Sequence, residues 1–213
     1  MAKSILFDLD GTLTDSGEGI MNCAKLALEH FGISVPEEQA LRVFVGPPLD
    51  ETFLKFGVPE DRTDEAVRVF RSRYLKVGKF ENHPYPGIYE ALQTLCDQGH
   101  RLYVATSKPE VTAVEIMDKF GLSKYFIKIC GATLDKSRSS KASVIEYLLG
   151  HGVEPAGAVM VGDTEFDVLG AAAFGIPTVG VSWGYGLVES MEKAGASAIV
   201  SSMDELVTVI NKM

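Results

Sequence analysis

Short apolar runs alternate along the chain with segments of helical period. The runs cover Ser4–Phe7, Arg101–Ala105, Phe126–Cys130, Ala158–Val161, Ile176–Val181 and Ala198–Val200. Because these runs are apolar on both faces, they are typical of strands in a parallel sheet that is covered on both sides. The segments between them carry apolar stripes with the spacing of amphipathic helices, such as Ile88/Leu92/Leu95 and Ala113/Ile116/Met117. The pattern predicts an α/β fold, a doubly wound three-layer sandwich around a parallel sheet.

The region from 15 to 83 breaks this alternation. It contains no convincing strand pattern, but one helical stripe runs from Ile20 to Phe31 and another from Val67 to Val77. We therefore expect a small all-helical cap domain at 15–83, inserted after the first strand, and an α/β core domain formed by 1–14 and 84–213. The proline-containing join from Asn82 to Gly87 is a candidate hinge.

Polar side chains gather where three of the predicted strands end. They are Asp8 and Asp10 after the first strand, Thr106, Ser107 and Lys108 after the second core strand, and Asp163 and Asp167 after the fourth. In open α/β sheets, ligands bind outside the carboxyl ends of the strands. We therefore expect these residues to share one site.

Four of these residues are carboxylates, and carboxylates in one crevice repel each other unless a cation neutralises them. A set rich in oxygen, without His or Cys, suits a hard ion such as Mg²⁺, which commonly meets a phosphate. Thr106 and a nearby lysine could donate hydrogen bonds to that phosphate. The pattern favours a site for Mg²⁺ and a phosphate group.

Helix capping is the alternative explanation for some of these residues. An Asp or Thr that follows a strand often serves only as a helix N-cap, and this reading stays open for Asp163 and Thr106. It does not fit Asp8 and Asp10, which lie two residues apart on the same face of an apolar strand and cost stability unless they serve a ligand.

Other polar features of the C-terminal half carry weaker signals. Lys141 begins a helical stripe, where a positive charge opposes the helix dipole, and this mismatch favours a functional role. We expect the nearby Lys136 and Arg138 to be solvated. The run Gly184–Gly186 is too weak a signal for a nucleotide-binding loop.

Composition excludes several classes of protein. The chain has 20 Lys and Arg against 29 Asp and Glu, a net charge of −9, which argues against nucleic-acid binding. Its 3 cysteines have no metal-binding spacing and are expected to be reduced thiols. The first residues lack the apolar segment of a secretory signal, and Pro177 interrupts the longest weakly polar stretch. We expect a soluble cytoplasmic protein with no membrane partner.

The motifs resemble those of the haloacid dehalogenase superfamily. The run Asp8-Leu9-Asp10-Gly11-Thr12-Leu13 is similar to the first motif, D-x-D-G-T, and Gly162-Asp163-Thr164-Glu165-Phe166-Asp167 is similar to the fourth. Thr106 and Lys141 resemble the second and third motifs and stand in the right order. The helical insertion is similar to the C1 cap of the phosphoglycolate phosphatase-like branch. Phe44–Leu49 and Tyr85–Ile88 look like a bacterial 5′-nucleotidase-like group within it.

The resemblance implies a mechanism for the residues that match the motifs. Asp8 would be the nucleophile and form an aspartyl-phosphate, and Asp10 would be the general acid and then the base. Mg²⁺ would be held by Asp8, the Asp10 backbone carbonyl and Asp163. Thr106 and Lys141 would bind the phosphoryl oxygens, with Ser107 and Lys108 as further substrate contacts. Asp167 would support the metal through water or pair with Lys141.

The resemblance therefore implies a Mg²⁺-dependent phosphatase that acts on a small phosphomonoester. Phosphoglycolate is the first candidate substrate, nucleoside 5′-monophosphates are the second, and a sugar phosphomutase is a third reading. Asp10 argues against a dehalogenase, whose halide leaving group needs no acid, and a binding role without catalysis would predict loss of Asp8 or Asp10. Residues suspected of setting specificity are Glu18, Asn22, Arg42, the Gly46–Leu49 loop and Lys108. The oligomeric state is expected to be a monomer or a homodimer.

Overall fold

The structure is a computed structural model that describes residues 2–135 and 137–213. Contacts divide the chain into two compact units. The first unit is formed by Met1–Thr14 and Pro84–Met213, and the second by Asp15–His83. The short strands β2 (Thr14–Asp15) and β3 (His83–Pro84) pair with each other where the chain passes from one unit to the other.

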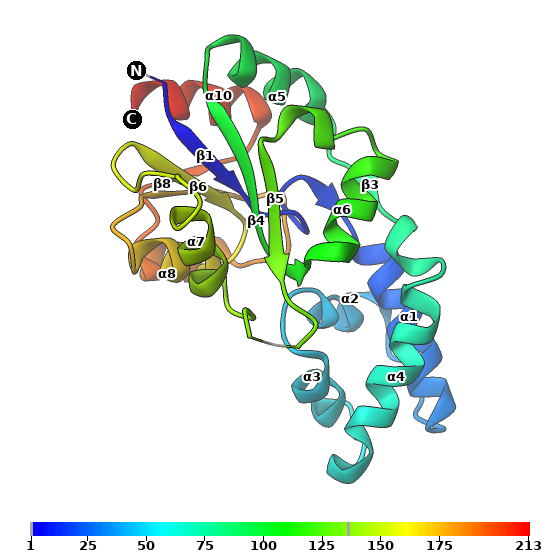
Figure 1. Cartoon of the computed structure of the whole chain (residues 1–213). Helices are drawn as coiled ribbons and strands as arrows, with labels where there is room; N and C mark the ends of the chain where they lie inside the picture. The colour runs from blue at the N-terminus through cyan, green and yellow to red at the C-terminus, as the bar shows by residue number, and fades with distance from the viewer. Residues whose placement is uncertain (1, 136) are drawn as a thin grey trace. The chain divides into compact units, whose positions relative to one another are not determined.

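In the first unit, six strands of the described chain form one parallel sheet in the order β5-β4-β1-β6-β7-β8 (Figure 1). The strands are β1 (Ser4–Phe7), β4 (Arg101–Pro109), β5 (Lys128–Ala132), β6 (Ala158–Gly162), β7 (Thr178–Val181) and β8 (Ala198–Val200). The chain continues from β1 to β4 on one side, and β6 lies on the other side of β1. This reversal of direction beside β1 confirms the doubly wound fold that the sequence predicts.

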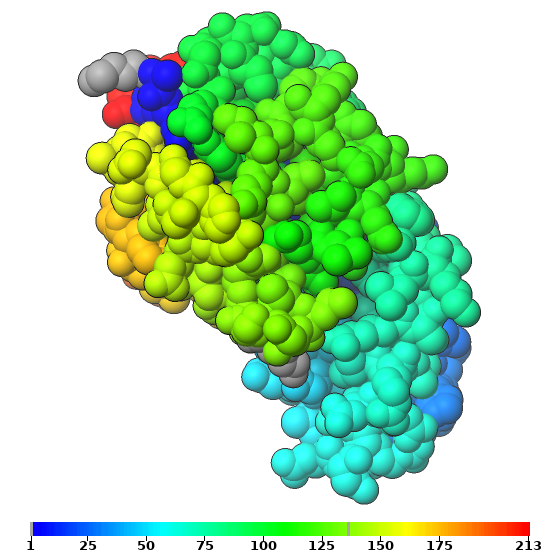
Figure 2. All heavy atoms as spheres, in the orientation of Figure 1, coloured from blue at the N-terminus to red at the C-terminus, as the bar shows by residue number. Residues whose placement is uncertain are grey.

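Helices cover both faces of the sheet. The apolar side chains of α5 (Ile88–Asp97), α6 (Glu110–Lys119) and α10 (Met203–Lys212) pack with Ile5 and Phe7 in one buried cluster. Those of α7 (Lys141–Leu149) and α8 (Glu165–Ala172) pack with Leu6 in another, and α9 (Val188–Ala194) lies beside α8. Because successive residues of a strand point to opposite faces, a four-residue strand contributes to both cores. In the space-filling view, dark-blue atoms from the beginning of the chain are visible at the upper left (Figure 2), whereas Ile5, Leu6 and Phe7 of β1 are buried.

Several strand boundaries differ from the sequence prediction. The strand expected at Ile176–Val181 begins at Thr178. The strand expected at Phe126–Cys130 is Lys128–Ala132, because Phe126 is apolar for another reason: its ring packs edge-on against Phe7, at 6.0 Å between ring centres. The strand expected to end at Ala105 continues to Pro109, so α6 begins at Glu110.

The second unit is helical. It contains α1 (Gly17–His30), α2 (Glu38–Leu41), α3 (Leu49–Lys55), α4 (Thr63–Tyr74) and the short 3-10 turns at Arg42–Phe44, Glu60–Arg62 and Gly78–Phe80. Its core is rich in aromatic rings, among them Phe44, Phe53 and Phe70. The guanidinium of Arg73 makes a two-pronged ion pair with Glu81, at 2.5 and 2.7 Å. Within the described part of the chain, no helix of either unit has both the length and the apolar surface needed to cross a bilayer.

Candidate active site

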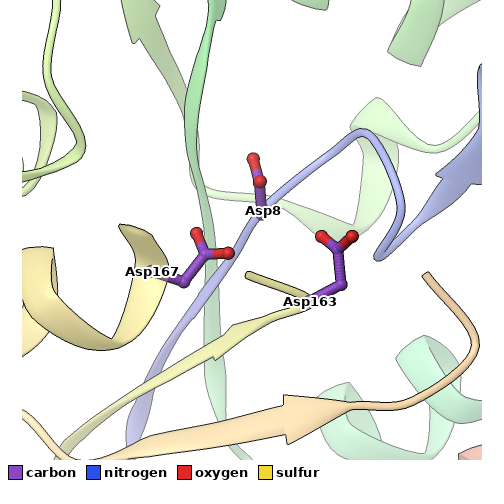
Figure 3. A group of neighbouring side chains, drawn as sticks. All are labelled: Asp8, Asp163 and Asp167. Atoms are coloured by element: carbon purple, nitrogen blue, oxygen red, sulfur yellow. The ribbon is translucent and has the colours of Figure 1, made fainter. Parts of the chain in front are cut away.

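Three carboxylates meet at the carboxyl edge of the sheet in the α/β unit. Asp8 follows β1, Asp163 follows the neighbouring β6, and Asp167 lies in the first turn of α8 (Figure 3). One oxygen from each lies within 4.8 Å of the others. The pairing of Phe7 with Val161 explains the proximity, because it aligns the ends of β1 and β6. These residues come from the predicted site, and the fold brings them together.

Lys141 lies among these carboxylates. It is the first residue of α7, and its Nζ is 2.9 Å from Oδ1 of Asp8 and 2.7 Å from Oδ1 of Asp167. Nζ also donates a hydrogen bond of 2.8 Å to the carbonyl of Ala105 at the end of β4. Burial alone would lower the pKa of Lys141, but the charges of Asp167 and Asp8 raise it above its usual value. The lysine therefore stays charged at the centre of the site.

Asp167 uses its two oxygens for different tasks. Oδ1 pairs with Lys141, whereas Oδ2 accepts hydrogen bonds from the backbone N–H and the hydroxyl of Thr164, at 3.1 and 2.9 Å. Thr164 is the N-cap of α8, so Asp163 does not have the capping role that the sequence left open. Of the two roles expected for Asp167, the pairing with Lys141 is the one present in this structure.

Asp163 is buried and receives two hydrogen bonds. The Thr12 hydroxyl donates to Oδ1 at 3.1 Å, and the backbone N–H of Tyr185 donates to Oδ2 at 2.8 Å. Burial raises the pKa of Asp163 to about 7, with a further contribution from the negative charges of Asp8 and Asp167. The two hydrogen bonds oppose this rise only in part.

The loop after β7 forms a close wall around Asp163. A Cβ atom on Gly184 would lie 2.4 Å from Oδ2 of Asp163, and one on Gly186 would lie 1.9 Å from the Asp163 carbonyl. The indole N–H of Trp183 donates to the carbonyl of Thr12 at 3.2 Å. Sequence reasoning missed this role, because a Gly-x-Gly run says nothing about which strand end it packs against.

The carboxylates of this cluster are chemically suited to a divalent cation. Burial raises the pKa of Asp8 to about 6; Lys141 lowers it, whereas Asp167 and Asp10 raise it. Raised pKa values at both Asp8 and Asp163 mean that their negative charge is only partly compensated by the residues around them. The donor atoms are all oxygen, which fits a hard ion such as Mg²⁺.

Asp10 lies outside this cluster of side chains and pairs with Lys108. The ammonium of Lys108 contacts Oδ2 of Asp10, and the two side chains are only 6% and 19% exposed. Oδ1 of Asp10 is buried without a hydrogen-bond partner among the residues that the structure describes. The contribution to a metal that the resemblance implies for Asp10 is that of its backbone carbonyl, which these side-chain contacts leave untested.

Thr106 is buried near the end of β4 and does not cap a helix. Its hydroxyl accepts a hydrogen bond of 3.2 Å from the backbone N–H of Lys108, and the N-cap of α6 is Pro109. Ser107 is exposed. The capping alternative for Thr106 is therefore wrong, and the residue stays a candidate for phosphate binding.

The expectation of a solvated Arg138 is wrong. Its Nη2 lies 2.5 Å from Oε2 of Glu110, its Nε donates to the Gly131 carbonyl at 2.7 Å, and its guanidinium lies 3.9 Å above the Tyr147 ring. The pair joins the start of α6 to the loop before α7, a contact that the sequence could not reveal because 28 residues separate its partners. Lys136, for which solvation was also expected, lies outside the described residues.

Comparisons with known proteins agree with these motifs. A family model described as haloacid dehalogenase-like hydrolase matches residues 5–181. A 5′-nucleotidase from Pseudomonas aeruginosa is 43% identical over 185 residues, which cover 86% of this chain and 84% of the relative. The tyrosine-protein kinase PtkA from Mycobacterium tuberculosis is 42% identical over 205 residues, which cover 95% of this chain and 70% of the kinase.

More distant relatives and solved structures extend the comparison. A phosphoglycolate phosphatase from Vibrio parahaemolyticus is 28% identical over 218 residues, 98% of this chain and 96% of the relative. The crystal structure of a predicted phosphatase from Clostridium acetobutylicum superposes with a TM-score of 0.93 at 41% identity and covers 100% of both chains. The sequence motifs, the sheet topology and these similarities show that the chain belongs to the haloacid dehalogenase-like hydrolase family.

Proposed function

We propose that the protein is a Mg²⁺-dependent phosphatase that hydrolyses a small phosphomonoester through a phosphorylated Asp8. The observation that carries the proposal is the position of Asp8, largely but not fully buried at the carboxyl edge of the sheet, beside Lys141 and two residues before Asp10. A carboxylate so placed can attack phosphorus while a neighbouring cation offsets the charge of the phosphate.

The contacts of Asp8 assign the attacking atom. Oδ1 is held by Lys141 and by the backbone N–H of Leu9, at 2.9 and 2.7 Å. We therefore assign the attack to Oδ2, which forms the new P–O bond while the bond from phosphorus to the leaving oxygen breaks. Asp10 gives its proton to the leaving oxygen. In the second step water attacks phosphorus, Asp10 takes a proton from that water, and the Asp8 carboxylate is released with inorganic phosphate.

Asp8, the backbone carbonyl of Asp10 and Asp163 would hold the Mg²⁺ ion, which when bound supplies positive charge against the phosphate and the carboxylates. Thr106 and Lys141 would donate hydrogen bonds to the phosphoryl oxygens, since Thr106 lies near the end of β4, beside β1, and Lys141 at the start of α7 contacts Asp8. The helical unit 15–83 would act as a cap that excludes water and selects the leaving group. Glu18, Asn22, Arg42 and the Gly46–Leu49 loop stay candidates for that selection.

The similarities give an order in which to test substrates. The relative named 5′-nucleotidase is 43% identical, whereas the one named phosphoglycolate phosphatase is 28% identical. We therefore place nucleoside 5′-monophosphates before phosphoglycolate, with sugar phosphates third. The cytoplasmic location and the state of monomer or homodimer stay predictions from the sequence.

Transfer of a phosphoryl group to protein tyrosine is the second candidate function. It is favoured by the 42% identity to the tyrosine-protein kinase from M. tuberculosis. In that reaction a nucleoside triphosphate would be the donor, and a tyrosine hydroxyl would take the place of water as the acceptor.

Phosphate release with Mg²⁺ tests the proposal. The panel comprises nucleoside 5′-monophosphates, phosphoglycolate and sugar phosphates, and a parallel assay offers γ-labelled ATP with a tyrosine-containing peptide. We expect release from at least one monoester, abolished by Asp8→Asn and by chelation of the metal. Label on the peptide without release from any monoester would replace the first function by the second. If the protein shows neither activity, a binding role is the remaining function.

A further inference from the structure

We propose that Lys108 is a positioning residue for Asp10: by holding Oδ2, it makes Oδ1 the oxygen that exchanges the proton with the leaving group and with water. This inference rests on the proposed phosphatase function and differs from the substrate contact that the sequence suggests for Lys108.

The pair is built within the α/β unit. Lys108 and Asp10 are both largely buried, and the ammonium of Lys108 contacts Oδ2 of Asp10. Oδ1 is buried and lacks a hydrogen-bond partner in the described part of the chain. A buried oxygen without a partner costs free energy unless a ligand supplies one, so Oδ1 is the oxygen of Asp10 that is left to pair with a bound substrate.

The backbone of Lys108 is itself fixed. Its N–H donates to the Thr106 hydroxyl at 3.2 Å. Its carbonyl packs against the backbone of Gly131, where an added Cβ would come within 2.4 Å of that carbonyl. Gly131 in turn donates its N–H to Glu110 at 3.2 Å, and Glu110 pairs with Arg138. Lys108 therefore extends from a rigid strand end, which suits a residue that must hold another in place.

An ammonium group decides where the proton of Asp10 can lie. It only donates hydrogen bonds, so a proton on Oδ2 would point at another donor. The proton of the acid form is therefore carried by Oδ1. In the first step it passes from Oδ1 to the leaving oxygen as the P–O bond breaks, and in the second step Oδ1 receives the proton of the attacking water. Without Lys108 the carboxyl group would be free to rotate, and the proton would often be misplaced.

Leaving-group dependence separates positioning from a substrate contact. The leaving group of adenosine 5′-monophosphate is the 5′-alkoxide of adenosine, a strong base that needs the proton. The leaving group of p-nitrophenyl phosphate is p-nitrophenolate, a weak base that does not. Loss of the correct Asp10 geometry should therefore lower kcat/KM mainly for the first ester. A lysine that bound the phosphate would affect both esters equally, since they share that group.

The experiment measures kcat/KM for both esters in Lys108→Met, Lys108→Arg and the control Lys193→Met, whose lysine is 80% exposed on α9. We expect Lys108→Met to lose about 100-fold with adenosine 5′-monophosphate and less than about 5-fold with p-nitrophenyl phosphate. Lys108→Arg should recover part of the loss, and Lys193→Met should match the wild type. If Lys108→Met does not fold, Lys108→Gln gives the same comparison, because it also removes the positive charge but keeps a polar side chain.

A double-mutant cycle completes the test. In the Asp10→Asn background, Lys108→Met should cause little further loss with adenosine 5′-monophosphate, because the proton carrier is already absent. Equal losses for the two esters, or a full additional loss in the Asp10→Asn background, would overturn the assignment while leaving the phosphatase function intact. A wild-type protein that hydrolyses neither ester, nor phosphoglycolate or any sugar phosphate of the panel, would instead remove the proposed function and this inference with it.

Discussion

Lys141 and Asp167 are joined by a 2.7 Å ion pair between the first turns of two helices, α7 and α8. The same Asp167 side chain is part of the capping box of α8, since its second oxygen accepts hydrogen bonds from Thr164. The start of α8 and the position of the lysine are therefore set by one carboxylate. This arrangement ties the local stability of a helix to the charge balance around Asp8.

Replacement of Asp167 by Asn should weaken both structure and activity. The amide can still accept the hydrogen bonds of Thr164, but the negative charge beside the buried Lys141 is lost, and Asp8 alone then compensates it. Removing one partner of a buried pair costs about 3–5 kcal/mol. We expect a loss near the lower end of that range in urea unfolding, together with reduced turnover.

Glu165→Gln is the matched control for that measurement. It removes a carboxylate from the same turn of α8 at a position that is more exposed than Asp167. We expect it to change the free energy of unfolding by less than about 0.5 kcal/mol. Equal effects of the two variants would show that the Lys141 pair is not what Asp167 contributes.

Replacement of Gly184 by Ala should impair metal binding. The new Cβ would lie 2.3 Å from the Cβ of Asp163 and 2.5 Å from the Gly11 carbonyl, so the loop or the aspartate must move. Displacement of groups that orient a metal ligand typically costs about 10–100-fold in affinity. We expect the Mg²⁺ dissociation constant measured by calorimetry to increase by that factor.

Gly150→Ala serves as the comparison for Gly184→Ala. Its Cβ would meet neighbouring atoms at 3.6 Å, an ordinary contact, and its φ of −62° suits alanine. We expect unchanged Mg²⁺ affinity in this variant. An unchanged affinity in Gly184→Ala as well would contradict the role of the loop around Asp163.

The pKa values of Asp8 and Asp163 predict how stability depends on pH. Both are raised from 3.8, to about 6 and about 7, so without metal the folded protein keeps protons that the unfolded chain has already released. The contribution of these groups is therefore most favourable at low pH, and stability falls as pH rises from about 4 to about 7. Mg²⁺ should reverse this fall, because the cation replaces the protons.

Thermal unfolding in chelator and in Mg²⁺ checks this prediction. We expect Mg²⁺ to raise Tm more at about pH 8 than at about pH 5, where protons compete with the cation for the carboxylate oxygens of Asp8 and Asp163. In Asp163→Asn the difference between the two pH values should shrink. A rise in Tm that is independent of pH would be inconsistent with protons and metal sharing these carboxylates.

Trp183 should report ligand binding by its fluorescence. Trp183 is the single tryptophan of the chain. Its indole N–H donates a hydrogen bond to the carbonyl of Thr12, and the hydroxyl of Thr12 donates one to Asp163. We expect its emission to change when Mg²⁺ is added, and the change should be lost in Asp163→Asn. An emission spectrum that does not respond to Mg²⁺ concentrations at which calorimetry detects binding would disprove the link.

Much of the fold could be predicted because its signals are local. The strands at Ser4–Phe7 and Ala198–Val200 agree with the apolar runs at both ends, since these runs are short and bounded by polar residues. The predicted start of the strand at Phe126 was wrong because a ring that packs against Phe7 looks, in sequence, like a strand residue. An apolar pattern indicates burial, but burial alone does not distinguish a strand from the buried segment that leads into it.

Some features of the site could also be predicted from the sequence, whereas others could not. The meeting of Asp8, Asp163 and Asp167 follows from topology, because parallel strands deliver their ends to one edge. The partner of Lys108 does not follow, since the sequence places it 98 residues from Asp10 and gives no sign of which atom it reaches. Pairings of side chains between strand ends depend on rotamers and on the exact end of each strand, and neither is encoded in a local pattern.

The glycines around Asp163 have a consequence for protein engineering. Gly11 has a positive φ, and an added Cβ there or at Gly184 or Gly186 would come within 1.9–2.3 Å of another atom. Random variation at these three positions would therefore produce mostly inactive or unstable clones, whatever substrate is screened. A library meant to change the substrate range would do better to leave this corner fixed and to place its diversity in the helical unit, where alternative side chains can be tried without disturbing the carboxylates.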